Sequence, residues 1–119
     1  MSRTMLLVAM TMSTLACDNP LEPSDILDQT WHLVSIERAG LPPLVVDDPS
    51  RYTLRLESER ALVQSDCNSC NGTQALDESM LQVGPLACTR AFCGEDSLDQ
   101  LFPQALDGTH RVSVSGSEL

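Results

Sequence analysis

Hydrophobic and polar residues alternate in the first half of the chain in a way that predicts paired β-strands. Residues 31–36 are rich in bulky and β-branched side chains and predict a first strand, preceded by a short turn of helix at residues 25–29. Residues 51–57 alternate cleanly, with apolar side chains on one face and mostly polar or charged ones on the other. A turn at residues 58–60 leads into a return strand at residues 61–65. This pattern predicts a hairpin with one buried face.

Turn signals interrupt the pattern before and after this hairpin. Residues 39–50 contain three prolines and are predicted to form a loop. Residues 66–72 are predicted to be a cysteine-bearing corner, with Asn71–Gly72 as a turn signal between strands. Residues 74–76 and 80–83 are predicted to pair as a second hairpin.

One helix is predicted, over residues 95–106. Its apolar residues are spaced as one stripe along a helix face: Leu98, Leu101, Phe102, Ala105 and Leu106. Pro103 lacks the N–H that a helix interior needs, so a kink or two abutting short helices is expected. Residues 111–115 alternate and predict a final strand. Together the elements predict a mostly β (α+β) domain, a small antiparallel sheet with one amphipathic helix packed on it.

The N-terminal residues differ from the rest of the chain. Residues 1–4 carry one positive charge, on Arg3, and residues 5–16 are uncharged and largely apolar. As a helix, this apolar run would reach only about 18 Å, well short of the roughly 30 Å of hydrocarbon in a bilayer. Residues 1–16 are therefore interpreted as a secretory signal peptide. The alternative is an N-terminal helix buried in the domain.

Cys17 directly follows the apolar run, after Leu15 and Ala16, and this arrangement resembles the lipobox of bacterial lipoproteins. In that motif a signal peptidase cuts before a cysteine that carries a diacylglyceryl group. The match departs from the motif in one place, since the motif prefers leucine three positions before the cysteine and Leu15 is two before. Residues 17–27 are interpreted as the lipidated cysteine and a flexible, proline-containing tether. The alternative is ordinary cleavage near Ala16, which leaves Cys17 as a free thiol.

The chain is acidic, with a formal net charge of −10. Binding to nucleic acid and docking on an anionic membrane through a basic patch both need clustered positive charge, so neither is expected. Only one Trp, one Tyr and two Phe are present, so the core is thin. A domain this small often requires covalent cross-links. We expect a monomer that meets the membrane through its lipid anchor.

Four further cysteines form two local pairs, Cys67 with Cys70 and Cys88 with Cys93. In an oxidising compartment, disulfides are the usual state of such a set. Two alternatives remain open at this point. Four thiolates can hold a tetrahedral zinc ion, although the second pair is wider than the usual spacing. A redox-active pair at Cys67 and Cys70 would be expected at the start of a helix, whereas a turn signal follows here.

The elements follow one another in a recognisable order: a tryptophan strand, a Tyr-Thr-Leu hairpin, a Cys-Asn corner and a Gly-Pro-Leu-Ala run that leads to a cysteine. The residues concerned are Trp31, Leu33, Tyr52, Thr53, Leu54, Cys67, Asn68, Gly72, Gly84, Leu86, Ala87, Thr89, Arg90 and Cys93. Over residues 28–119 this order resembles the META-domain family, the HslJ-like group of bacterial envelope proteins. The resemblance implies a cracked-barrel-like sheet with one helix.

The resemblance has two more structural implications. Cys70 and Cys88 stand where the family has an aromatic and a small residue, which implies the disulfides Cys67–Cys93 and Cys70–Cys88. The family continues through one more hairpin beyond the position of Leu119, and that hairpin completes the sheet. Its absence from this sequence implies either a truncated sequence or an open, less stable sheet edge.

For activity, the resemblance implies an association with envelope stress, with antibiotic tolerance and, by structural likeness, with lipoprotein pilots of secretion systems. It supplies no catalytic residues, and we predict no enzyme activity, cofactor or metal site. The first functional hypothesis is a non-catalytic cell-envelope lipoprotein that binds an envelope protein or serves in the stress response. The alternative is a carrier or sensor that binds a small or lipidic ligand in the barrel cleft.

Two residues are candidate contacts for a ligand or partner, Arg90 and Trp31. For Arg90, the alternative role is a structural hydrogen bond to the corner loop. An apolar cavity flanked by Trp31 and Phe102 would favour the ligand-binding hypothesis, and a flat exposed strand edge would favour protein binding. The expected location is the bacterial cell envelope, lipid-anchored and extracytoplasmic, facing the periplasm or in the outer membrane.

Overall fold

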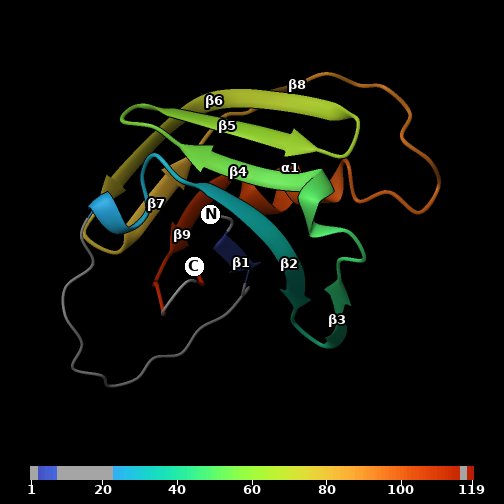
Figure 1. Cartoon of the computed structure of the whole chain (residues 1–119), viewed down its shortest axis with the longest axis horizontal. Coiled ribbons are helices and arrows are strands. Elements are labelled where there is room, and N and C mark those ends of the chain that lie inside the picture. The colour runs from blue at the N-terminus through green and yellow to red at the C-terminus, as the bar shows by residue number, and fades with distance from the viewer. Residues whose placement is uncertain (1–2, 8–22, 116–117) are drawn as a thin grey trace.

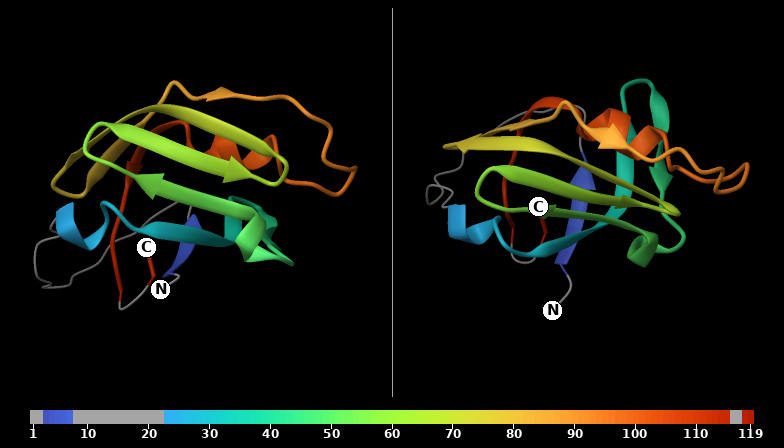
Figure 2. Two further views of the ribbon diagram at one scale, coloured as in Figure 1. Left: turned by 45° about the horizontal axis from the view of Figure 1, so that its top comes forward. Right: turned by 90° about the horizontal axis from the view of Figure 1, so that it is seen from above.

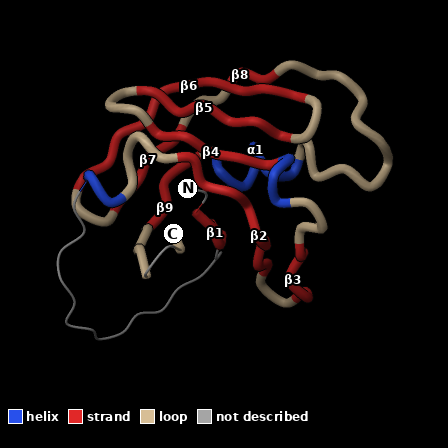
Figure 3. Tube along the Cα trace, in the orientation of Figure 1, coloured by secondary structure: helices blue, strands red, loops and turns tan. Residues whose placement is uncertain are grey.

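The computed structural model describes residues 3–7, 23–115 and 118–119. Within these residues the chain forms nine strands, one α-helix and two short 3-10 helices (Figures 1 and 3). The strands are β1 (Arg3–Leu7), β2 (Thr30–Arg38), β3 (Leu41–Val45), β4 (Tyr52–Leu56), β5 (Arg60–Ser65), β6 (Asn68–Asp77), β7 (Met80–Val83), β8 (Ala87–Cys88) and β9 (Gly108–Arg111). The helix is α1 (Leu101–Leu106), and the 3-10 helices are η1 (Pro23–Asp25) and η2 (Pro49–Arg51).

Strands β2, β4 and β5 form the centre of a strongly curled sheet, as the alternating pattern predicts. Trp31 of β2 pairs with Leu54 of β4, which in turn pairs with Val63 of β5. All three side chains lie on the same face and are at most 3% exposed. The period of two in the sequence therefore places every second residue of these strands in the core.

The sheet runs in the order β1-β2-β4-β5-β6-β7-β9, with β3 added to β2 and β8 added to β6. The pairings between these nine strands are antiparallel except that of β1 with β2, which is parallel. The antiparallel sheet predicted for residues 28–119 is therefore confirmed, and the addition of β1 from outside that range makes the whole sheet mixed. Because the sheet curls on itself, β1 and β9 approach each other as the two ends of a half-barrel (Figure 2).

The core fills the inside of this half-barrel, and α1 lies against β5 on the inner side (Figure 1). Phe102 and Leu106 of the helix are buried, and Phe102 packs edge-on against Tyr52 with ring centroids 6.1 Å apart. The apolar stripe is confirmed as the buried side of this segment. No helix in the described parts of the chain is long and apolar enough to cross a membrane.

The helix is shorter than the stripe predicts, and it is not kinked. It begins at Leu101, so Pro103 lies in the first turn, where a missing N–H leaves no helical hydrogen bond broken. The carbonyl of Asp99, which a helical N–H at position 103 would contact, accepts from the Ser65 hydroxyl at 2.8 Å. Residues before Leu101 are irregular because side chains take their main-chain N–H groups, as Tyr52 does for Leu98.

Four other predicted boundaries are wrong. The loop predicted at residues 39–50 contains β3, whose two prolines are tolerated because β3 is an edge strand. The final strand is β9, several residues earlier than predicted. The helical turn expected at residues 25–29 is the 3-10 helix η1, ending at Asp25.

The fourth correction concerns the corner at residues 66–72. Only Asp66 and Cys67 turn, and Asn71 and Gly72 lie inside the ten-residue strand β6. Gly72 is required by a close approach, since a Cβ there would lie 2.5 Å from the carbonyl oxygen of Pro85. A glycine in a strand can therefore mark a backbone contact as well as a turn.

Candidate functional site

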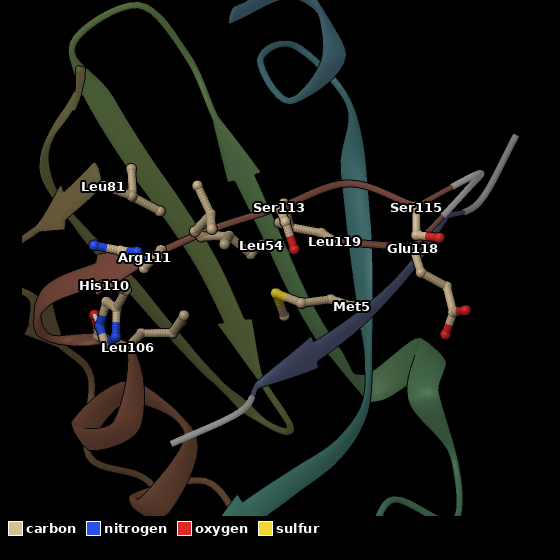
Figure 4. Close-up of a pocket in the computed structure, with 11 residues that line it drawn as sticks. Met5, Leu54, Leu81, Leu106, His110, Arg111, Ser113, Ser115, Glu118 and Leu119 are labelled. Atoms are coloured by element: carbon tan, nitrogen blue, oxygen red, sulfur yellow. Dashed lines mark hydrogen bonds between the residues drawn. The ribbon is translucent and has the colours of Figure 1, made fainter. Parts of the chain in front are cut away.

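The seam where the half-barrel fails to close contains an apolar cavity of about 230 Å³ (Figure 4). Three leucines from different elements, Leu54, Leu81 and Leu106, form much of its wall. The other lining residues come from β1, β9 and the C-terminal segment: Met5, His110, Arg111, Val112, Ser113, Ser115, Glu118 and Leu119. The Met5 side chain points into the middle of this set in Figure 4. It is 1% exposed and belongs to the hydrophobic core.

Hydrogen bonds tie β1 to the C-terminal segment across the seam. The N–H of Leu119 donates to the carbonyl of Thr4 at 3.1 Å, and Thr4 forms a parallel bridge with Glu118. Nearby, a ring nitrogen of His110 lies 2.6 Å from the carbonyl oxygen of Leu106, which joins β9 to the end of α1. The seam is thus an apolar space with main-chain groups and a few polar side chains at its rim.

A second constellation is built around Asn68, a 3% exposed side chain at the start of β6. Its amide oxygen accepts from the Ala91 N–H at 2.7 Å and from the Thr89 hydroxyl at 2.9 Å. Its amide nitrogen contacts the Ala91 carbonyl at 3.0 Å and the Asp99 carboxylate at 3.1 Å. One buried amide therefore fixes the long loop between β8 and α1, which carries Cys93.

A third constellation joins Asp66 to the loop that precedes α1. The Asp66 carboxylate accepts from the Ser97 hydroxyl at 2.7 Å and from Arg51 at 2.5 and 2.9 Å. Its side chain is only 7% exposed. The hydrogen bond from Ser97 and the charge and hydrogen bond of Arg51 stabilise the ionised form and lower the pKa of Asp66, against the opposing effect of its burial. These bonds hold the loop against the sheet.

Arg90 is exposed and lines a groove of about 500 Å³ beside β8 and α1. Within the described residues its side chain forms no hydrogen bond or ion pair, so the structural bond to the corner loop that was one of its two expected roles is not formed. Its main-chain neighbours Thr89 and Ala91 make the contacts to Asn68 instead.

Trp31 does not lie at a surface. It is 0% exposed, and its indole N–H donates to the carbonyl of Ile26 at 3.0 Å. The expectation of a ligand or partner contact at Trp31 is wrong for this structure, because its position on β2 faces the core. An apolar cavity does exist, but the residues that line it do not include Trp31 or Phe102.

The four cysteines after the tether are joined as Cys67–Cys93 and Cys70–Cys88, the pairing that the resemblance implies. Their sulfurs are therefore not free to act as zinc ligands or as a redox-active dithiol in this structure. Elsewhere in the described ranges no three His, Cys, Asp or Glu residues are grouped to hold a metal ion. Cys17 lies outside the residues that the structure describes, so its lipidation stays a prediction.

The class of this domain is defined by a curled half-barrel sheet with one short helix inside it and two disulfides, one between β6 and β8 and one from the turn before β6 to the loop after β8. The chain belongs to the META domain family, whose model matches residues 24–119. No curated protein matches the chain at a significant level.

One solved structure, the NMR structure of a protein from Burkholderia xenovorans, is similar in fold. It has a TM-score of 0.60 and 24% sequence identity, and the match covers 82% of this chain and 76% of that chain. At this level of identity the likeness extends to the fold alone.

Sequence reasoning missed three parts of these sites. Asn68 is among the residues that carry the family resemblance, but no local pattern in the sequence indicates that its amide binds Ala91, 23 residues away. Sequence reasoning also missed the Asp66 contacts, because Ser97 and Arg51 are far from it in sequence. It assigned Met5 to the apolar signal run, where nothing in the pattern points to the cavity.

Proposed function

We propose that this META domain protein is a non-catalytic module of the cell envelope that binds another protein through the open seam of its half-barrel. The observation that carries the proposal is the pairing of β2 with β1, a short extended segment that reaches the sheet from outside the matched domain. An edge that pairs with one such segment has the geometry for strand addition, a common mode of protein recognition.

We further propose that the protein is extracytoplasmic and anchored by a lipid on Cys17. The two disulfides are typical of proteins outside the cytoplasm. The apolar run before Ala16 and Cys17 supports export and lipidation. Metabolic labelling with palmitate tests the anchor: Cys17→Ser is expected to abolish labelling and to release the protein from membranes. Unchanged labelling of this variant would contradict the anchor.

Protein binding is tested by photo-crosslinking in intact cells. A photoreactive residue at Ser115, on the rim of the seam, is compared with one at Glu59, on the exposed turn between β4 and β5. We expect a protein adduct of defined mass from position 115 and none of that mass from position 59. Adducts that are absent, or equal at the two positions, would contradict binding at the seam.

A carrier of small or lipidic ligands is the second candidate, and the apolar cavity favours it. Its volume of about 230 Å³ lies below the several hundred Å³ that enclose most small-molecule ligands. Lipid adducts without protein adducts from position 115 would favour this function over the first.

A further inference from the structure

Residues 3–7 occupy a slot that has two distinct parts. The first part is the edge of β2 on the side away from β4, where β1 pairs in parallel from Trp31 to Ile36. The second is an apolar socket below that edge, which receives Met5 and leaves it 1% exposed. The carbonyl of Thr4 accepts from the Leu119 N–H and so ties the segment to the C-terminal residues.

The slot requires an extended backbone and one large apolar side chain, and not a particular amino-acid sequence. Main-chain hydrogen bonds along β2 are available to any extended peptide, while the socket accepts one large apolar side chain. Leu54, Leu81 and Leu106 line the socket (Figure 4). Of the described residues that line it, the Asp, Glu, Lys or Arg residues are Arg111 and Glu118, and both are exposed. Any extended segment with an apolar residue at the position of Met5 meets both requirements.

The segment that fills the slot is also the segment predicted to be removed on export. Loss of residues 1–16 would leave the edge of β2 unpaired and the socket empty. An unpaired edge leaves main-chain N–H and C=O groups available to another strand, and an empty apolar socket loses its packing. Both changes favour occupation by a new segment.

We infer that in the processed protein this slot binds an extended segment of a partner protein as a parallel strand on β2, with a large apolar side chain in the Met5 socket. The inference rests on the proposed function and names its partner chemistry. The excess of acidic residues, 17 against 7 basic ones, favours a basic segment. A lipid chain would fill the socket but would leave the main-chain groups of β2 unpaired, so a peptide fits better.

The test uses the full chain with Met5→Glu, because a carboxylate is costly in the apolar socket and should expel the segment. The probe is a fluorescent octapeptide with the sequence of residues 2–9, SRTMLLVA. We expect it to bind Met5→Glu at least about tenfold more tightly than the unaltered chain, where the tethered segment competes at a high effective concentration. Fluorescence anisotropy measures both affinities.

Two matched controls accompany this measurement. Met80→Glu alters an exposed methionine on β7 and is expected to bind the peptide as weakly as the unaltered chain. A peptide with glutamate in place of its methionine is expected not to bind any form. If Met5→Glu loses its circular dichroism or its disulfides, Met5→Ala replaces it, with a smaller gain expected.

Equal binding of the two peptides, or equal affinity of Met5→Glu and the unaltered chain, would overturn the inference. Association of Met5→Glu with a second copy instead of the peptide would also overturn it, since the occupant would then be this chain. The proposed function can fail separately from the slot. Peptide binding to Met5→Glu without protein adducts at position 115 in cells would support the slot and contradict a cellular protein partner.

Discussion

The two disulfides are nested, and this arrangement predicts how their losses combine. Cys70–Cys88 links residues 18 apart and lies inside Cys67–Cys93, which links residues 26 apart. With the inner bond intact, the outer bond closes only the stretches from Cys67 to Cys70 and from Cys88 to Cys93. That effective loop has about nine residues, because the inner bond already joins Cys70 to Cys88 and removes the residues between them from the loop that the outer bond closes.

The chain-entropy estimate gives the magnitudes at 25 °C. Alone, the inner bond is worth about 3.2 kcal/mol and the outer about 3.5 kcal/mol. Given the inner bond, the outer adds about 2.6 kcal/mol, so both together contribute about 5.8 kcal/mol. Removing the inner bond alone then costs about 2.3 kcal/mol, and the loss of both exceeds the sum of the single losses by about 0.9 kcal/mol.

Urea unfolding of three variants tests this expectation. The paired substitutions are Cys67→Ser with Cys93→Ser, Cys70→Ser with Cys88→Ser, and all four together. Serine keeps a hydroxyl that can accept the bonds made to the Cys93 sulfur by the Cys67 N–H and the Asn68 amide. Single losses that sum to the combined loss, or an outer loss near 3.5 kcal/mol, would refute the nested-loop reasoning.

Three further predictions concern anchors in the fold. Asn68→Ala should lower the free energy of unfolding by about 2–4 kcal/mol in urea, because it leaves buried loop groups unpaired; a loss below about 1 kcal/mol would mean that water replaces the amide. Gly72→Ala should cost about 1–3 kcal/mol, since its Cβ would meet the Pro85 carbonyl, and an unchanged urea midpoint would contradict that contact. The folded-state pKa of Asp66 lies below the ordinary 3.8, so its stabilisation is full above about pH 4 and is lost as the pH falls through the folded-state pKa. Asp66→Asn should remove this loss, and identical acid denaturation of the two proteins would argue against it.

The sequence predicts the parts of the fold that depend on local pattern. Alternation along β2, β4 and β5 decides which face of each strand is buried, because the side-chain period of a strand is two. The hairpin of β6 and β7 follows in the same way, from two short apolar runs around a polar turn.

What the sequence does not predict depends on contacts between distant residues. The proline-containing β3 pairs only because the edge of β2 lies beside it, and propensity alone argues against a strand there. Gly72 has the appearance of a turn residue until the approach of Pro85 is known. The irregular segment before α1 is bound by Tyr52, whose hydroxyl accepts from the Leu98 N–H, 46 positions away.

The candidate site also has parts that the sequence predicts and parts that depend on contacts between distant residues. The cysteine pairing followed from the family resemblance, and the exposure of Arg90 agrees with one of its two expected roles. The seam could not be predicted, because it forms where two ends of the chain meet after the sheet has curled. Met5 lies in that seam, although its sequence context resembles that of any signal peptide.

The loop between β8 and α1 is held in part through main-chain atoms, which every residue possesses. Asn68 binds the main-chain N–H and carbonyl of Ala91, and Ser65 binds the main-chain carbonyl of Asp99. Between these anchors, Cys93 and Ser97 are tied by a disulfide and a side-chain hydrogen bond. Exposed side chains there that make no such contact are free to diverge, and Phe92 at 83% exposure is one that the fold does not constrain. Evolution can change the surface of this loop while the scaffold beneath it persists, so relatives that share the anchors can differ in what the loop presents.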